Sequence, residues 1–127
     1  MRYFFLMFFI LFTGCKEKEL TPVGREYQLM ADSPLTVTLG FNPDGRFYGK
    51  ALNNYWGQYH IRDNIISFSG ITNTMKAGTL PQMQAEKKYF DALTNGHSFE
   101  IKEDELKIFF DENGILIFQL NANQMDF

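Results

Sequence analysis

The stretch Gly45-Arg-Phe-Tyr-Gly-Lys-Ala-Leu-Asn-Asn-Tyr-Trp-Gly-Gln-Tyr59 decides the fold of this 127-residue chain. Its three glycines, at 45, 49 and 57, interrupt a run of aromatic and amide side chains. Glycine inside strand-like sequence marks a turn, a bulge or a close backbone approach. An alternating segment, Leu35 to Phe41, leads into the stretch through Asn42-Pro-Asp-Gly45, and a second alternating segment follows it. We therefore expect a tightly bent crossing within a small β structure.

Outward from this stretch, period-two alternation and turn residues predict about eight short strands. The expected strands are Glu26 to Met30, Leu35 to Phe41, Arg46 to Ala51, Gln58 to Arg62, Ile65 to Ser69 with an irregular continuation at Ile71 to Met75, Ser98 to Lys102, Glu105 to Phe110 and Ile115 to Leu120. Asp63-Asn64 is a two-residue hairpin signal. The short acidic turns between the last three strands imply antiparallel pairing.

A single helix is predicted over Gln82 to Thr94. Pro81 stands at its start and Asn95-Gly96 at its end, which is the usual asymmetry of helix termini. A helical wheel gathers its apolar residues on one face: Met83, Ala85, Tyr89, Phe90, Ala92 and Leu93. The sequence thus predicts a mainly β, α+β fold, in which a small curled antiparallel sheet or half-barrel packs against one helix.

The first 24 residues predict export and lipidation. Residues 1–14 contain an apolar run too short to span a bilayer as a helix but suited to a secretory signal. The run ends in Leu11-Phe-Thr-Gly-Cys15, which resembles a bacterial lipobox and makes Cys15 the expected site of acylation, including palmitate. An uncleaved anchor and an ordinary signal peptide are the alternatives. Residues 15–24 are expected to form a tether and residues 25–127 the folded domain.

Composition argues against several classes of function. The formal net charge is −3 and no basic cluster exists, so nucleic acid is not an expected partner. The two histidines, His60 and His97, have no second ligand at metal-binding spacing, and no serine stands in a nucleophile elbow. We expect no metal, no cofactor and no catalysis.

The residues Gly45-Arg46, Gly49, Asn53, Tyr55 and Gly57 resemble the META domain, the HslJ-type heat-shock lipoprotein family (DUF306 type). Asn73-Thr74-Met75 and the following helix fall at matching separations, so the resemblance covers roughly Tyr27 to Leu120. It implies a lipocalin-like fold in the cell envelope and a loose link to stress and antibiotic tolerance. It brings no agreed biochemical activity.

Two departures from the family pattern have structural consequences. The paired cysteines of the family align with Leu52 and Ala77, so any disulfide of those members is absent here. The alignment implies that Leu52 and Ala77 are neighbours at disulfide-like separation, held by apolar contact. Thr74 replaces an arginine, so any role of that side chain does not carry over.

Two groups of residues are candidates for special roles. Tyr48, Asn53, Asn54, Tyr55 and Trp56 could form a binding patch, because amides and aromatic rings suit sugars and peptides; turn chemistry is the alternative reading. Glu86 falls inside the apolar arc of the predicted helix. It either reaches past the helix edge to water or forms a buried polar tie between helix and sheet. Either role is structural.

Three functions are consistent with these observations. The leading hypothesis is a non-catalytic lipoprotein of the cell envelope that acts as an interaction or stress-tolerance module. We expect a lipid anchor on Cys15 and an envelope protein as partner. The residue after Cys15 is Lys16 and not the aspartate of inner-membrane retention, so we expect the outer membrane, on its periplasmic or surface face. The alternatives are a carrier of an apolar small molecule and an inhibitor of an envelope or secreted enzyme. An open interior would favour the carrier, whereas a filled interior with exposed aromatic residues would favour protein binding.

Overall fold

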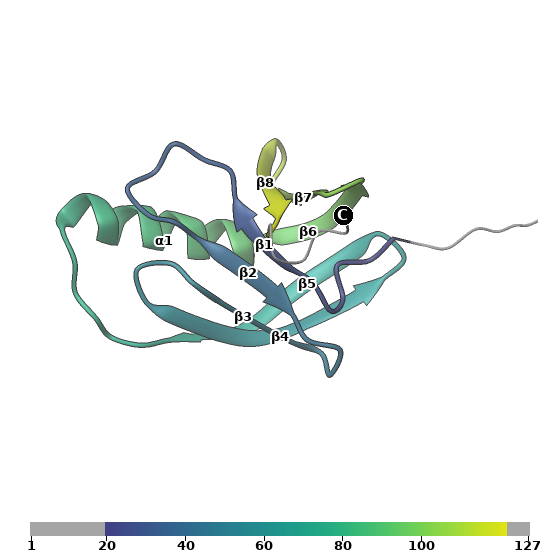
Figure 1. Cartoon of the computed structure of the whole chain (residues 1–127), viewed down its shortest axis with the longest axis horizontal. Coiled ribbons are helices and arrows are strands. Elements are labelled where there is room, and N and C mark those ends of the chain that lie inside the picture. Colours follow the sequence, from purple (N-terminus) through teal and green to yellow (C-terminus); the bar gives the residue numbers. More distant parts are fainter. Residues whose placement is uncertain (1–19, 122–127) are drawn as a thin grey trace, which may run out of the picture.

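The computed structural model describes residues 20–121 as an eight-stranded antiparallel barrel with one helix (Figure 1). The elements follow one another as β1 (Glu26–Leu29), β2 (Thr38–Phe41), β3 (Arg46–Lys50), β4 (Asn54–Arg62), β5 (Ile65–Asn73), α1 (Leu80–Thr94), β6 (Gly96–Lys102), β7 (Glu105–Phe110) and β8 (Gly114–Leu120). Each strand pairs with its neighbour in the chain, and β1 pairs with β8 to close the sheet. The predicted fold class is confirmed, and the expected half-barrel is a closed one.

Aromatic side chains fill the inside of the barrel. Tyr27, Phe41 and Phe47 are at most 1% exposed, and leucines and isoleucines of β7 and β8 complete the core. The rings meet edge to face, with centroids 5.1 Å apart for Phe41–Tyr59 and 5.4 Å apart for Phe47–Phe68. Such edge-to-face contacts are a favoured arrangement of aromatic rings. The interior is therefore occupied by side chains of the protein itself.

Two glycines of the 45–59 stretch make room for this aromatic core. Gly49 pairs with Tyr55 across β3 and β4, and a Cβ on Gly49 would overlap the carbonyl of Thr38 and lie 2.7 Å from the Tyr55 hydroxyl. Gly57 pairs with Phe47, whose ring would lie 2.5 Å from an added Cβ. Aromatic rings thus cover the bare backbone of glycines on the facing strand, which stabilises a strongly curved sheet. The prediction of a tightly bent crossing is confirmed.

A bulge divides the long hairpin β4–β5. Trp56 pairs with Thr72 and Gln58 with Ser69, so two residues of β5 stand opposite Gly57. The first of the two, Gly70, has a positive φ of 65°, as the glycine of this type of bulge does. The expected irregular continuation of this strand is confirmed as far as Asn73, since β5 runs from Ile65 to Asn73 through the bulge. The bulge bends β4 and β5 around the core.

Helix α1 lies beside the weakest seam of the barrel. Strands β5 and β6 share one register pair, Ile65 with Ser98, and then diverge. The chain leaves β5, loops round and returns as α1, which contacts β5 and β7 (Figure 1). A capping box begins the helix: the Thr79 hydroxyl accepts from Gln82 N–H, and the Gln82 side chain accepts from Thr79 N–H. Helix α1 starts two residues before the predicted Gln82.

Candidate functional site

The five residues of the predicted binding patch do not share one surface. Tyr48 and Trp56 lie opposite each other on the outside of β3 and β4, 36% and 46% exposed, with Asn54 also exposed. Asn53 and Tyr55 point the other way and are 4% and 1% exposed. Inclusion of Asn53 and Tyr55 in a surface patch is therefore wrong: Tyr55 alternates with Asn54 and Trp56 along β4 and so faces the other side of the sheet, and Asn53, just before β4, is buried as well. Tyr48, Asn54 and Trp56 remain as an outer aromatic face.

Asn53 instead forms a buried polar node with Glu86 of α1. Its backbone N–H donates to Glu86 Oε2 at 2.7 Å, and its side-chain Nδ2 donates to Glu86 Oε1 at 3.1 Å. The Asn53 Oδ1 accepts from Lys76 N–H at 2.6 Å and from the Thr74 hydroxyl at 2.8 Å. The node joins the β3–β4 connection, the β5–α1 loop and the helix. Of the two readings of Glu86, the structure selects the buried tie from helix to sheet.

A second polar contact lies one helical turn further along α1. The hydroxyls of Tyr55 and Tyr89 are 2.6 Å apart, and Tyr55 donates to the Thr38 carbonyl at 2.6 Å, so Tyr89 is the donor to Tyr55. Burial raises the pKa of both phenols above the usual value of 10.0. Both side chains therefore stay neutral at physiological pH. The hydroxyl pair and the fully buried Leu93 together hold one side of α1 against the barrel.

The predicted core face of the helix is correct except at its start. Tyr89, Ala92 and Leu93 are buried and Phe90 is half-buried, but Met83 is 40% exposed. The expectation that Met83 packs in the core is wrong, because the first turn of α1 extends beyond the barrel.

The structure places Leu52 close to the segment that contains Ala77. Leu52 is buried, and its methyl groups would lie 2.9 and 3.0 Å from a Cβ on Gly78, the residue after Ala77. Ala77 itself is exposed. The two segments are thus adjacent, and disulfide-like separation of Leu52 and Ala77 stays a prediction.

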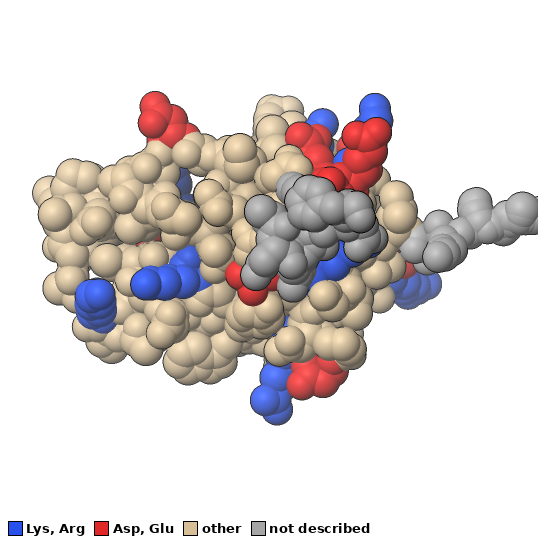
Figure 2. Space-filling view, viewed as in Figure 1, with Lys and Arg blue, Asp and Glu red and all other residues tan. Residues whose placement is uncertain are grey.

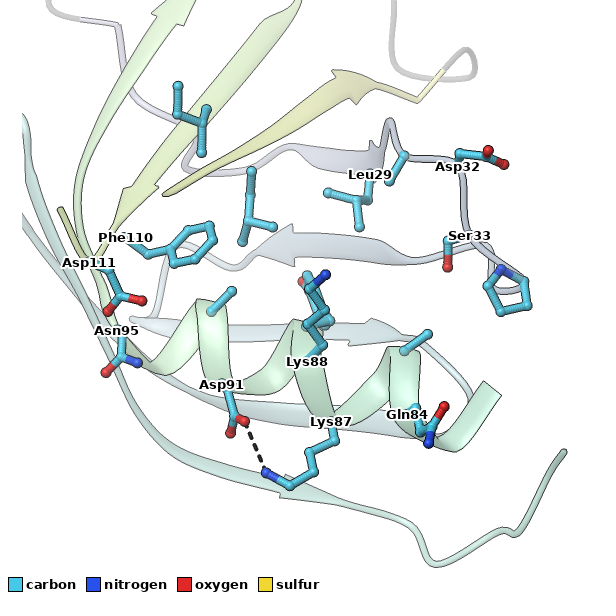
Figure 3. Close-up of a pocket in the computed structure, with 17 residues that line it drawn as sticks. Leu29, Asp32, Ser33, Gln84, Lys87, Lys88, Asp91, Asn95, Phe110 and Asp111 are labelled. Carbon is cyan, nitrogen blue, oxygen red and sulfur yellow. Dashed lines mark hydrogen bonds and ion pairs between the residues drawn. The ribbon is translucent and has the colours of Figure 1, made fainter. Parts of the chain in front are cut away.

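A groove of about 810 Å³ runs along one side of α1 (Figure 3). Three segments far apart in sequence form it: the β1–β2 connection, the helix and the β7–β8 hairpin. We call it the α1 groove. Its lining residues are Leu29, Ala31, Asp32, Ser33, Pro34, Gln84, Ala85, Lys87, Lys88, Tyr89, Asp91, Ala92, Asn95, Phe110, Asp111, Ile115 and Leu116. The volume lies within the range of small-molecule and peptide sites.

Small residues on the helix create the depth of the α1 groove. Ala85, Tyr89 and Ala92 follow one another at helical spacing of four and three residues, so they share one face. The two alanines leave space above the helix backbone. Leu29 of β1 and Leu116 of β8, both half-buried, lie across from them. The floor is consequently apolar.

Charged groups stand around this apolar floor. Lys88 reaches from α1 into the space between the helix and Leu29, whereas Lys87 and Asp91 point away and form an ion pair of 3.0 Å (Figure 3). Lys88 has no hydrogen bond or ion pair within residues 20–121. Asp32 lies at one end of the groove and Asp111 at the other. The sequence did not predict this site, because its lining comes from three distant segments and only the spacing of Ala85 and Ala92 hints at it.

The remaining candidate chemistry is dispersed. His60 is exposed on β4, while His97 Nε2 lies 2.9 Å from the Asp111 carbonyl and Nδ1 lies 3.1 Å from the Ser98 hydroxyl. Over residues 20–121, no three or more His, Cys, Asp or Glu side chains gather where they could hold a metal ion. Charges of both signs are scattered over the face seen in Figure 2. Within the same residues, no helix has the length and apolarity needed to span a membrane.

The fold and the bent 45–59 crossing define a small lipocalin-like barrel of the META type. The META domain family profile matches residues 19–123, and the chain belongs to the META domain family. A comparison with curated proteins gives no match.

Solved structures share the fold at low sequence identity. A protein from Burkholderia xenovorans, determined by NMR, is 19% identical with a TM-score of 0.68, covering 86% of this chain and 94% of that one. A second NMR structure is 14% identical with a TM-score of 0.62, covering 80% and 92%. A DUF4847 family protein from Bacteroides vulgatus is 18% identical with a TM-score of 0.51, covering 71% and 61%. In the first two, the shared fold makes up more than nine tenths of the solved chain.

Proposed function

We propose that this META domain protein is a non-catalytic interaction module of the cell envelope, held at the membrane by a lipid on Cys15. One observation carries the proposal: aromatic side chains of the protein fill the barrel. A lipocalin-like carrier holds its ligand inside the barrel, so a filled interior favours recognition through the outer surface. Cys15 and the signal segment 1–14 lie outside the described residues, and the lipid anchor rests on the sequence resemblance to a lipobox.

Two outer features support recognition of a protein. The outer aromatic face presents Tyr48 and Trp56 from rigid strands, and such residues are enriched at interaction sites. The α1 groove presents an apolar floor with a charged rim. An enzyme inhibitor would be one instance of such a module. A role in stress tolerance would follow from the partner that the module binds.

Photo-crosslinking in native envelopes tests the proposal. The full-length, lipidated protein would carry a photo-reactive amino acid at Trp56 or at Lys88, with Glu100, an exposed position on β6, as the control. We expect a protein adduct from at least one of the first two positions and none from Glu100. Adducts from neither, or from all three alike, would contradict the proposal.

The anchor has its own test. Cys15→Ser should abolish partitioning into the detergent phase and lower the yield of adducts, because the protein would no longer be held at the membrane. Unchanged partitioning would show that the apolar N-terminal segment is itself the anchor.

A further inference from the structure

We infer that the α1 groove binds an extended peptide segment of a partner protein, with apolar side chains on the floor and an acidic residue over Lys88. This inference rests on the proposed function and specifies the kind of partner. It follows from the length, the lining and the charges of the groove.

The length of the groove suits a short extended peptide. Its helix side runs from Gln84 to Asn95, which at about 1.5 Å per residue spans about 16 Å. An extended chain rises about 3.3 Å per residue, so about five residues cover this distance. Alternate side chains of such a peptide would face the apolar floor.

The distribution of polar groups favours a peptide over an acyl chain. A fatty acid has one polar end, whereas a peptide carries amides along its whole length. Along the helix side of the groove, Gln84, Lys88 and Asn95 place polar groups at the beginning, in the middle and at the end. Peptide amides can bond to side chains at all three levels.

The charges around the groove predict the order of charged and apolar residues along the peptide. The ammonium of Lys88 has no partner within residues 20–121 and stands over the apolar floor, where a carboxylate would pair with it. Asp32 and Asp111 occupy the two ends, and Lys87 and Asp91 neutralise each other. The complementary segment is therefore basic at its ends, acidic at its centre and apolar between them.

A selection experiment tests the inference. Residues 20–127 contain every strand pair of the barrel, including the β1–β8 pair that closes it, so this part of the chain is used. A library of linear heptapeptides would be selected on this domain and counter-selected on Ala85→Trp, which fills the groove. We expect enriched peptides with a central acid between apolar residues, and backbone amide shifts in NMR confined to the three groove segments.

Lys88→Glu provides a variant that alters charge without touching the core. It should weaken an enriched peptide about tenfold or more, whereas the matched Lys102→Glu, at a position that does not line the groove, should leave affinity unchanged. Equal effects of both variants would overturn the charge pairing.

Three outcomes would overturn the peptide inference. In the first, the selection enriches no peptide on the domain over the Ala85→Trp variant. In the second, the enriched peptides shift only the NMR signals of backbone amides around Tyr48 and Trp56. In the third, the fatty acid decanoate shifts the amide signals of the groove segments and no peptide does. The second outcome would leave the proposed interaction function intact. Failure of the crosslinking in native envelopes would remove that function whatever the library yields.

Discussion

The two sides of helix α1 differ in what they do for the molecule. The side facing the barrel is held by Glu86, Tyr89 and Leu93, all buried, through a polar node, a hydroxyl pair and apolar contact. The side facing the α1 groove carries the half-buried Ala85 and the exposed Lys88, and Tyr89 lies where the two sides meet. Because contacts on one side hold the helix in position, the residues on its other side are already ordered before a ligand binds. Such preorganisation lowers the entropic cost of binding.

The largest effect is expected at the buried centre of the fastened side. Leu93→Ala should lower the free energy of unfolding by about 4 kcal/mol, because Leu93 is fully buried and the substitution leaves a cavity. Denaturant melts would measure the loss. Gln84→Ala, on the groove side of the same helix, is the control and should cost less than about 0.5 kcal/mol. Similar losses for both would erase the proposed difference between the two sides.

The node should contribute almost as much. Asn53→Ala keeps the backbone N–H that donates to Glu86 but removes the Nδ2 donor to the buried carboxylate and the Oδ1 acceptor of Lys76 N–H, at a cost of about 3 kcal/mol. Asn54→Ala changes the neighbouring, exposed amide and should cost far less. Equilibrium unfolding of both variants checks this expectation. A loss below about 1 kcal/mol for Asn53→Ala would mean that water replaces Asn53 in the node.

The hydroxyl pair should have a smaller effect that depends on pH. Tyr89→Phe removes one buried hydrogen bond while Tyr55 keeps its bond to Thr38, so the loss at neutral pH should be about 1 kcal/mol.

Above pH 10 the unfolded chain loses phenolic protons that the folded chain keeps, because burial raises the pKa of Tyr89 and Tyr55 in the folded state. The contribution of these two tyrosines to the free energy of unfolding is therefore fully present below pH 10 and decreases as the pH rises further. Tyr89→Phe should flatten this decline. An unchanged slope in melts at pH 9 to 11.5 would contradict the assignment of the shift to Tyr89.

The smallest effect on stability is expected in the groove. Lys88→Glu should change the free energy of unfolding by less than about 0.5 kcal/mol, since Lys88 is exposed and unpaired within the described residues. Its effect should appear in peptide affinity instead. A large destabilisation would show that Lys88 belongs to the structural side of the helix.

Much of the fold was predictable because it depends on local patterns. Alternation located the strands, Pro81 and Asn95 bounded the helix, and Glu86 stood out within an apolar arc. Alternation along β4 could also have placed Tyr55 on the same side of the sheet as Tyr59, opposite Asn54 and Trp56. The assignment of Tyr55 to the surface ignored this signal.

The rest was not predictable, because it arises from distant segments. The partner of Glu86 lies 33 residues away, and no local pattern links it to Asn53. The α1 groove needs the β1–β2 connection and the β7–β8 hairpin to meet the helix, which only barrel closure brings about.

The central claim is that the buried Asn53–Glu86 node fixes α1 on the barrel. A double-mutant cycle measures it most directly, with Asn53→Ala, Glu86→Ala and the double variant unfolded in denaturant. We predict a coupling of about 1.5 kcal/mol or more, with the double variant less damaged than the sum of the single variants. Losses that add to within about 0.5 kcal/mol would contradict the claim, because residues that do not interact give additive effects.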